Sequence, residues 1–160
     1  MIKTKIMFKK TKIGPGAYLK GANLRRTDLR GADLRGADLR GADLREADLR
    51  DANIRSANLY GADLRGADLN RANLKDAILS GANLMHVKTY GADLRCANFY
   101  GADLRGADLR CADLRDASLF GADLMHALTY GADLSGIKYD SDTIYDEGSN
   151  LDLYIKNLES

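Results

Sequence analysis

Residues 32–51 read Ala-Asp-Leu-Arg-Gly, Ala-Asp-Leu-Arg-Gly, Ala-Asp-Leu-Arg-Glu and Ala-Asp-Leu-Arg-Asp, four nearly identical groups of five. The same period runs without insertion or deletion from Ala17 to Gly136, which makes 24 pentads in 120 residues. The first position of a pentad is mostly Ala, the second mostly Asp or Asn, and the third mostly Leu. An internal repeat of this regularity decides the architecture before any secondary structure is considered.

A period of five fits neither an α-helix nor a plain β-strand. Each step of five residues turns a helix by about 500°, so leucines at this spacing would scatter around its circumference. A strand alternates its side chains with a period of two. The pattern fits a chain that turns after every short extended segment, because Asp, Asn and Gly are typical turn residues. We therefore expect the Leu and Ala columns to be buried and the Arg, Asp and Gly columns to face solvent.

The motif A-(D/N)-L-x-x resembles that of the pentapeptide repeat proteins, and the resemblance covers 120 of the 160 residues in one register. What it implies is an all-β fold, a right-handed quadrilateral β-solenoid with four pentads in each coil. The 24 pentads would then form six coils, and at about 4.8 Å for each coil the rod would be roughly 29 Å long. The stability of such a rod would be close to a sum of contacts between neighbouring coils.

The N-terminal segment, residues 1–16, differs in kind from the repeat. Apolar residues at Ile2, Ile6 and Phe8 alternate with lysines, which predicts a strand that covers the first coil. The tripeptide Gly14-Pro15-Gly16 predicts a turn into the solenoid of residues 17–136.

The C-terminal segment, residues 137–160, is predicted to close the other end of the rod with a short amphipathic helix. Ser149 and Asp152 form a capping box at its start. The apolar face of the helix consists of Leu151, Tyr154, Ile155 and Leu158. Because open solenoid ends expose strand edges, both terminal segments have a structural purpose.

The chain is nearly neutral, with 24 basic and 23 acidic residues and a net charge of +1. Its basic and acidic residues are unevenly spread, since residues 1–16 carry five lysines and no acid while residues 137–160 carry two lysines and six acids. No apolar run is long enough to span a bilayer, and the N-terminus lacks the apolar stretch of a signal peptide. We therefore expect a cytoplasmic protein without a membrane partner.

Every twentieth residue falls on the same face of such a rod, so that four faces can be read from the sequence. A candidate interaction face gathers apolar residues of the C-terminal half, and it includes two tyrosines that follow threonines in the Leu column, Thr89 and Thr129. Its residues are Tyr60, Ile78, Tyr100, Phe120, Tyr90 and Tyr130. A basic stripe runs along another face and consists of Arg35, Arg55, Lys75, Arg95 and Arg115.

The sequence offers no catalytic, cofactor-binding or metal-binding residues, and an enzyme is not expected. His86 and His126 stand at outward positions two coils apart, about 10 Å, which is too far for a shared metal ion. Cys96 and Cys111 fall on neighbouring faces, so the distance between their Cα atoms should exceed the roughly 7 Å limit for a disulfide.

Three functions remain. The sequence favours a non-catalytic scaffold, which presents a rigid face to an unknown protein partner or to a second copy of the chain. We expect that contact in the C-terminal half, with the apolar face of the helix as a second candidate. The family also includes DNA mimics that act on a type II topoisomerase (gyrase), but their surface is strongly negative and this solenoid is neutral. Direct nucleic-acid binding through the basic stripe is the third, and the balancing Asp columns would weaken it.

Overall fold

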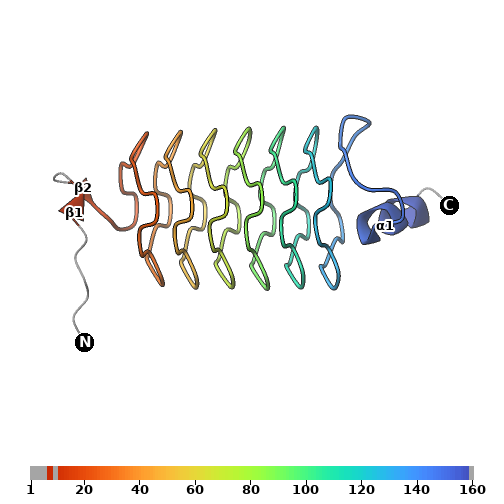
Figure 1. Cartoon of the computed structure of the whole chain (residues 1–160), viewed down its shortest axis with the longest axis horizontal. Coiled ribbons are helices and arrows are strands. Elements are labelled where there is room, and N and C mark those ends of the chain that lie inside the picture. Colours follow the sequence, from red (N-terminus) through yellow and green to blue (C-terminus); the bar gives the residue numbers. More distant parts are fainter. Residues whose placement is uncertain (1–6, 9–10, 159–160) are drawn as a thin grey trace.

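The computed structural model describes residues 7–8 and 11–158, which form a straight rod with a small hairpin at one end and a helix at the other (Figure 1). The hairpin pairs β1 (Met7–Phe8) with β2 (Thr11–Lys12) in antiparallel register. The helix α1 (Asn150–Leu158) lies past the last coil. Between them the chain winds repeatedly around the long axis of the rod.

The coils are held together by parallel bridges between residues 20 positions apart. These bridges run in an unbroken series from Tyr18↔Asp38 to Ser118↔Lys138, so that one turn of the solenoid takes four pentads. Within the series each Leu N–H donates to a carbonyl of the next coil, as Leu24 does to Asp43 at 2.7 Å. The β-solenoid that the family resemblance implied is confirmed.

The interior of the rod is a ladder of leucines flanked by alanines. From Leu34 to Leu119 the residues of the Leu column are at most 1% exposed, including Ile54, Phe99 and Thr89. Thr89 is accommodated because its Oγ1 donates to the carbonyl of Asp108 at 2.7 Å. The predicted burial of the Leu and Ala columns is confirmed. Most residues of the Asp/Asn column are half-buried, and only the fourth and fifth positions of the pentads are largely exposed.

The fifth position of each pentad turns the chain through a left-handed backbone conformation. At Gly106 φ is +64°, and an added Cβ would fall 2.5 Å from Nδ1 of His86 in the preceding coil. Side chains at this corner therefore lean along the rod toward its C-terminal end. Eleven such corners are occupied by residues other than glycine, among them His86 and His126.

The N-terminal cap differs from the sequence prediction where the structure describes it. Residues 2–6 of the predicted strand lie outside the described residues, and Phe8 belongs to β1. β1 pairs with β2 and forms a hairpin, which the sequence did not predict.

The C-terminal cap contains the predicted helix, and its apolar face is buried only in part. Leu151 and Ile155 are 1% and 2% exposed, and Tyr154 is half-buried, but Leu158 is 57% exposed. Leu158 ends α1 and lies beyond the turns that pack on the core. No helix among the described residues is long and apolar enough to cross a membrane.

The capping box at the start of α1 is displaced by one residue from its usual form. Ser149 Oγ accepts from the N–H of Asp152 at 3.1 Å, as a capping serine should. The Asp152 carboxylate accepts from the N–H of Gly148 at 2.8 Å and from Lys156 Nζ at 2.8 Å. These hydrogen bonds and the charge of Lys156 lower the pKa of Asp152, which is 4% exposed.

Candidate interaction surfaces

Arginine and aspartate neutralise one another within single pentads. In Asp43-Leu44-Arg45 the carboxylate accepts from Nε of the arginine at 2.8 Å and from Nη2 at 2.6 Å. This two-pronged pairing uses the planar geometry of the guanidinium group. The same pair recurs in ten pentads, namely 28/30, 33/35, 38/40, 43/45, 48/50, 63/65, 93/95, 103/105, 108/110 and 113/115.

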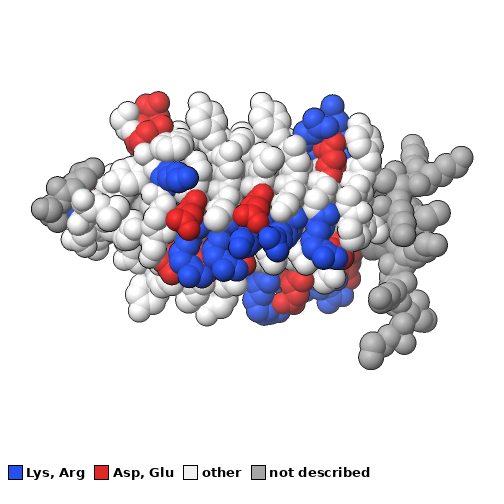
Figure 2. All heavy atoms as spheres, turned by 180° about the vertical axis from the view of Figure 1, so that it is seen from behind, with Lys and Arg blue, Asp and Glu red and all other residues white. Residues whose placement is uncertain are grey.

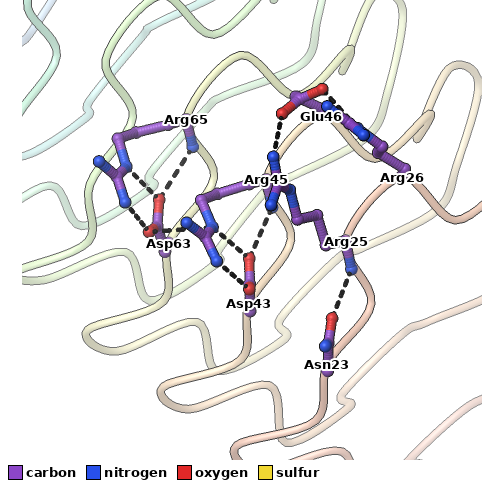
Figure 3. A network of polar contacts seen from close by, with 8 residues as sticks. All are labelled: Asn23, Arg25, Arg26, Asp43, Arg45, Glu46, Asp63 and Arg65. Carbon is purple, nitrogen blue, oxygen red and sulfur yellow. Dashed lines mark hydrogen bonds and ion pairs between the residues drawn. The ribbon is translucent and has the colours of Figure 1, made fainter.

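Further contacts link these pairs from coil to coil (Figure 3). Nε of Arg45 lies 3.6 Å from the carboxylate of Asp63 in the next coil. Where Asn23 replaces the aspartate, Arg25 instead reaches Glu46 at 2.8 Å, and Arg26 joins it at 2.7 Å. An arginine that lacks an aspartate in its own pentad therefore finds its partner in the neighbouring coil.

The paired carboxylates remain ionised well into the acidic range. Hydrogen bonds from the arginine of the same pentad lower the pKa of Asp38 and Asp43 to about 2. Hydrogen bonds from Arg26 and Arg25 likewise lower the pKa of Glu46 to about 2. These Arg–Asp and Arg–Glu pairs therefore stay closed at neutral pH.

The basic stripe predicted from the sequence lies along one face, and most of its charges are matched. Arg35, Arg95 and Arg115 each pair with the aspartate of their own pentad at 2.6–2.7 Å. Arg55 lies 3.4 Å from Asp76 of the next coil, and Lys75 has no ion pair with any described residue. Figure 2 shows basic and acidic side chains interspersed along the rod, beside a broad surface without charge.

We expect the basic stripe to leave duplex DNA unbound at physiological salt. Its arginines are already paired with carboxylates, so few positive charges remain to replace the counterions of DNA phosphates. Fluorescence polarisation with a labelled 20-base-pair duplex at 150 mM salt would measure this. Binding that is lost in the Arg55→Glu, Arg95→Glu double variant would contradict it.

An uncharged strip, here called the tyrosine face, occupies four successive coils of the solenoid. It consists of residues 58–61, 78–81, 98–101 and 118–121, in which no Asp, Glu, Lys or Arg occurs. The bridges Asn58↔Ile78, Ile78↔Asn98 and Asn98↔Ser118 place these segments directly on top of one another. A strip without charge is unusual here because neighbouring faces carry the Arg–Asp pairs.

The side chains of the tyrosine face project into solvent. Tyr60 is 60% exposed, Tyr100 is 62% exposed and Ile78 is 40% exposed, while Phe120 is half-buried. Asn58 and Asn98 stand where the charged pentads have aspartate, and their Oδ1 atoms accept from the N–H groups of Tyr60 and Tyr100 at 3.1 and 2.9 Å. The amide thus supplies the turn hydrogen bond without adding a charge.

Tyr90 and Tyr130 do not belong to the tyrosine face, although the sequence interpretation grouped them with it. They lie two pentads away in a coil of four, on the opposite side of the rod, next to the bridges Lys88↔Asp108 and Asp108↔Leu128. Both are exposed, at 49% and 76%. The predicted set therefore splits into two surfaces.

The polar members of the tyrosine face were missed in the sequence interpretation. Asn58, Ser80, Asn98 and Ser118 are flanked by no arginine in their pentads, whereas ten of the twelve arginines at the fourth position follow an aspartate. In the four pentads of this face both the Asp and the Arg are replaced by uncharged residues, and this joint replacement was the signal that could have found them.

The described residues offer no metal site, since no three His, Cys, Asp or Glu side chains among them lie close enough to share an ion. His86 and His126 are exposed, and His126 Nδ1 lies 3.2 Å from the carboxylate of Asp146. Cys96 and Cys111 are exposed free thiols. The hydroxyl of Tyr90 is hydrogen-bonded to Cys111, and this contact raises the pKa of Tyr90.

A family described as pentapeptide repeats matches residues 16–51, 52–88 and 92–136 of this chain, in eight copies. No curated protein matches the chain by sequence.

Solved structures resemble the chain as well. A pentapeptide repeat protein from the cyanobacterium Cyanothece 51142 is 36% identical, with a TM-score of 0.60, over 61% of this chain and 66% of that one. A pentapeptide repeat protein from the thylakoid lumen of Arabidopsis thaliana is 32% identical, with a TM-score of 0.52, over 62% and 66%. The match thus spans just under two thirds of each of these two proteins. A plasmid-mediated fluoroquinolone resistance protein is 28% identical over 88% and 73%, but its TM-score is 0.34.

Proposed function

The chain belongs to the pentapeptide repeat family, and on that premise we propose that it is a non-catalytic scaffold that binds a protein partner through the tyrosine face. The proposal includes the finer architecture expected from the sequence, a right-handed quadrilateral rod of 24 pentads in six coils. It rests on one observation, that a surface on which most arginines are paired with acidic side chains is interrupted by an uncharged aromatic strip over four coils.

The composition of the tyrosine face suits protein recognition. Tyrosine offers a large, rigid contact area at a small cost in conformational entropy, while Ser, Asn and Gly supply adaptable hydrogen bonds. The contact area comes from Tyr60 and Tyr100, and the hydrogen-bonding groups come from Asn58, Ser80 and Asn98. Charged residues are depleted at the centres of protein interfaces, as they are on this strip.

The backbone beneath the strip supports the proposal because it is held in place before any partner arrives. Backbone hydrogen bonds join every pentad of the face to the next coil. The N–H of Leu59 donates to the carbonyl of Ile78 at 2.7 Å, and the N–H of Leu79 donates to the carbonyl of Asn98 at 2.8 Å. A surface that is already ordered loses little conformational freedom on binding.

The DNA-mimic alternative has less support from this surface. A mimic of DNA needs a column of uncompensated negative charge, and here ten aspartates are matched by arginines within their own pentads. The structural likeness to the fluoroquinolone resistance protein carries no argument at its TM-score of 0.34. Gyrase modulation therefore remains the second choice.

A charge placed on the tyrosine face should remove the partner while leaving the rod folded. We expect the Tyr60→Arg, Tyr100→Arg variant to lose the proteins that cross-link to the wild-type chain in lysate of its host, because a partner would have to desolvate two guanidinium groups. The matched control is Tyr90→Arg on the opposite side, which should retain them. Identical cross-linked proteins for wild type and both variants would contradict the proposal.

Light scattering of the purified chain separates a foreign partner from a second copy. A wild type that is dimeric at 100 µM, and monomeric once Tyr60 and Tyr100 are changed, would assign the face to self-association.

A further inference from the structure

The solenoid ladder does not end evenly at its C-terminal end. After the last coil the chain covers two of the four faces, since Leu124 N–H donates to Ile144 at 2.7 Å and Gly121 N–H donates to the Asp140 carboxylate at 3.0 Å. On the next two faces, residues 127–136, no strand of the described chain follows. α1 stands beyond them instead (Figure 1).

Residues 127–131 therefore form a β-edge with free backbone groups. In the preceding coil, Leu109 and Cys111 donate their N–H groups to the carbonyls of Leu128 and Tyr130, at 2.9 and 3.1 Å. The equivalent donors one coil later are the N–H groups of Thr129 and Gly131, and no described residue accepts from them. The Ala127 carbonyl is likewise without a described donor.

The side chains beside this edge are apolar where those of the preceding coil are charged. Leu128 stands in the column of Asp108 and is 51% exposed, and Tyr130 stands in the column of Arg110 and is 76% exposed. Natural proteins usually protect a free strand edge with charges, because an uncharged one pairs with other chains. Leu128 and Tyr130 are exposed while Thr129 between them is 6% exposed, so an added strand would find apolar side chains on the outside of the edge and free N–H groups behind them.

Part of this edge faces an open cavity between the last coil and α1. An open cavity of about 500 Å³ is lined by Thr129, Gly131, Asp133 and Ser135 of the last coil and by Asn150 and Tyr154 of the cap. The hydroxyl of Tyr154 accepts from the N–H of Gly136 at 3.3 Å and so marks its far side.

The molecule itself contains a filled version of the same arrangement. Thr89 is the counterpart of Thr129 two coils earlier, and its N–H and Oγ1 both donate to the carbonyl of Asp108, at 2.9 and 2.7 Å. The N–H of Asp108 donates to the carbonyl of Val87 at 2.9 Å, and the N–H of Gly91 donates to the carbonyl of Arg110 at 3.1 Å. Three residues in extended conformation therefore satisfy a threonine edge of this kind.

We propose that residues 127–131 bind an extended apolar peptide segment of a partner protein, which adds to the solenoid as a parallel strand. The N–H of its first residue donates to the carbonyl of Ala127. The carbonyl of the same residue accepts from the N–H and Oγ1 of Thr129. Its second residue points inward toward the end of the Leu ladder. The carbonyl of its third residue accepts from the N–H of Gly131. The side chains of its first and third residues pack on Leu128 and Tyr130. This site lies apart from the tyrosine face and does not depend on it.

N-methyl scanning of a capped heptapeptide, Gly-Ala-Val-Leu-Tyr-Gly-Ala, tests the hydrogen-bond pattern. The peptide copies the spacing of residues 106–112, with Val and Tyr in place of Asp108 and Arg110 and Gly in place of Cys111. Methylation of the Val amide, which must donate to Ala127, should weaken binding at least about tenfold. Methylation of the Leu amide, which points away from the edge as that of Leu109 does, should leave the affinity within about twofold. Equal effects of the two methyl groups, or no binding at millimolar peptide, would overturn the proposal.

A matched pair of variants locates the peptide. Leu128→Asp with Tyr130→Arg restores the charges of the preceding coil and should abolish binding, whereas Ile78→Asp with Ser80→Arg makes the same change on the tyrosine face and should not. Circular dichroism confirms that both variants are folded. If the wild type instead dimerises through this edge, so that Leu128→Asp with Tyr130→Arg makes it monomeric, a second copy is the occupant and the peptide proposal is wrong.

Discussion

Leu69→Asp is expected to abolish the cooperative fold of the rod. Leu69 is fully buried in the Leu ladder, where nothing could pair with a carboxylate. Burying an unpaired charge should cost at least about 4 kcal/mol, a large part of the total stability of a domain of this size. Urea unfolding followed by far-ultraviolet circular dichroism, together with amide hydrogen exchange, would measure the loss.

Leu69→Thr is the matched control because the chain already tolerates threonine in this column. Thr89 directs its Oγ1 to the carbonyl of Asp108, and a threonine at 69 could reach the carbonyl of Lys88, which already accepts from the Leu69 N–H at 2.7 Å. The lost apolar volume should cost about 2–3 kcal/mol, so this variant should stay folded. Equal urea midpoints for the Asp and Thr variants would show that the ladder is not the core.

The repeat itself could be predicted because its energetics are local and identical in every pentad. Leu every five residues, with Ala before it and a turn after it, leaves few ways to bury the apolar columns. The family resemblance supplied the four pentads in each coil, which the bridges at 20-residue spacing show. Regular Asp beside regular Arg predicted a balanced surface. It did not predict that Asp43 and Arg45 close the pair inside one pentad, because that depends on the direction of both side chains.

The ends of the rod were predicted less well because the repeat no longer constrains them. The bridge Asp123↔Ile144 spans 21 residues instead of 20, so one extra residue shifts the register as the ladder ends. After this bridge the chain leaves the ladder and enters α1, which leaves the edge at Thr129 open, and no period reveals that. Leu158 fits a helical apolar pattern by spacing alone, but it lies past the part of the core that α1 covers.

Acid should destabilise the rod between about pH 4 and pH 2. The pKa values of Asp38, Asp43 and Glu46 are lowered to about 2 by their arginine partners, against about 4 in an unfolded chain. The unfolded state therefore binds protons first, so this contribution to stability is complete above pH 4 and lost as the pH falls toward 2. Since many pentads carry such a pair, the urea midpoint should be nearly constant from pH 7 to pH 5 and then fall steeply.

Asp43→Asn separates the loss of these pairs from general charge repulsion in acid. Asn23 and Asn53 show that the amide keeps the turn hydrogen bond, with their Oδ1 atoms accepting from the N–H groups of Arg25 and Arg55 at 3.2 and 3.4 Å. The variant therefore loses only the carboxylate that Arg45 contacts twice. Its urea midpoint should lie below that of the wild type at pH 7, and the difference should vanish at pH 2, where Asp43 of the wild type is itself becoming protonated. A difference that persists unchanged at pH 2 would mean that the Asp–Arg pairs do not carry the acid sensitivity.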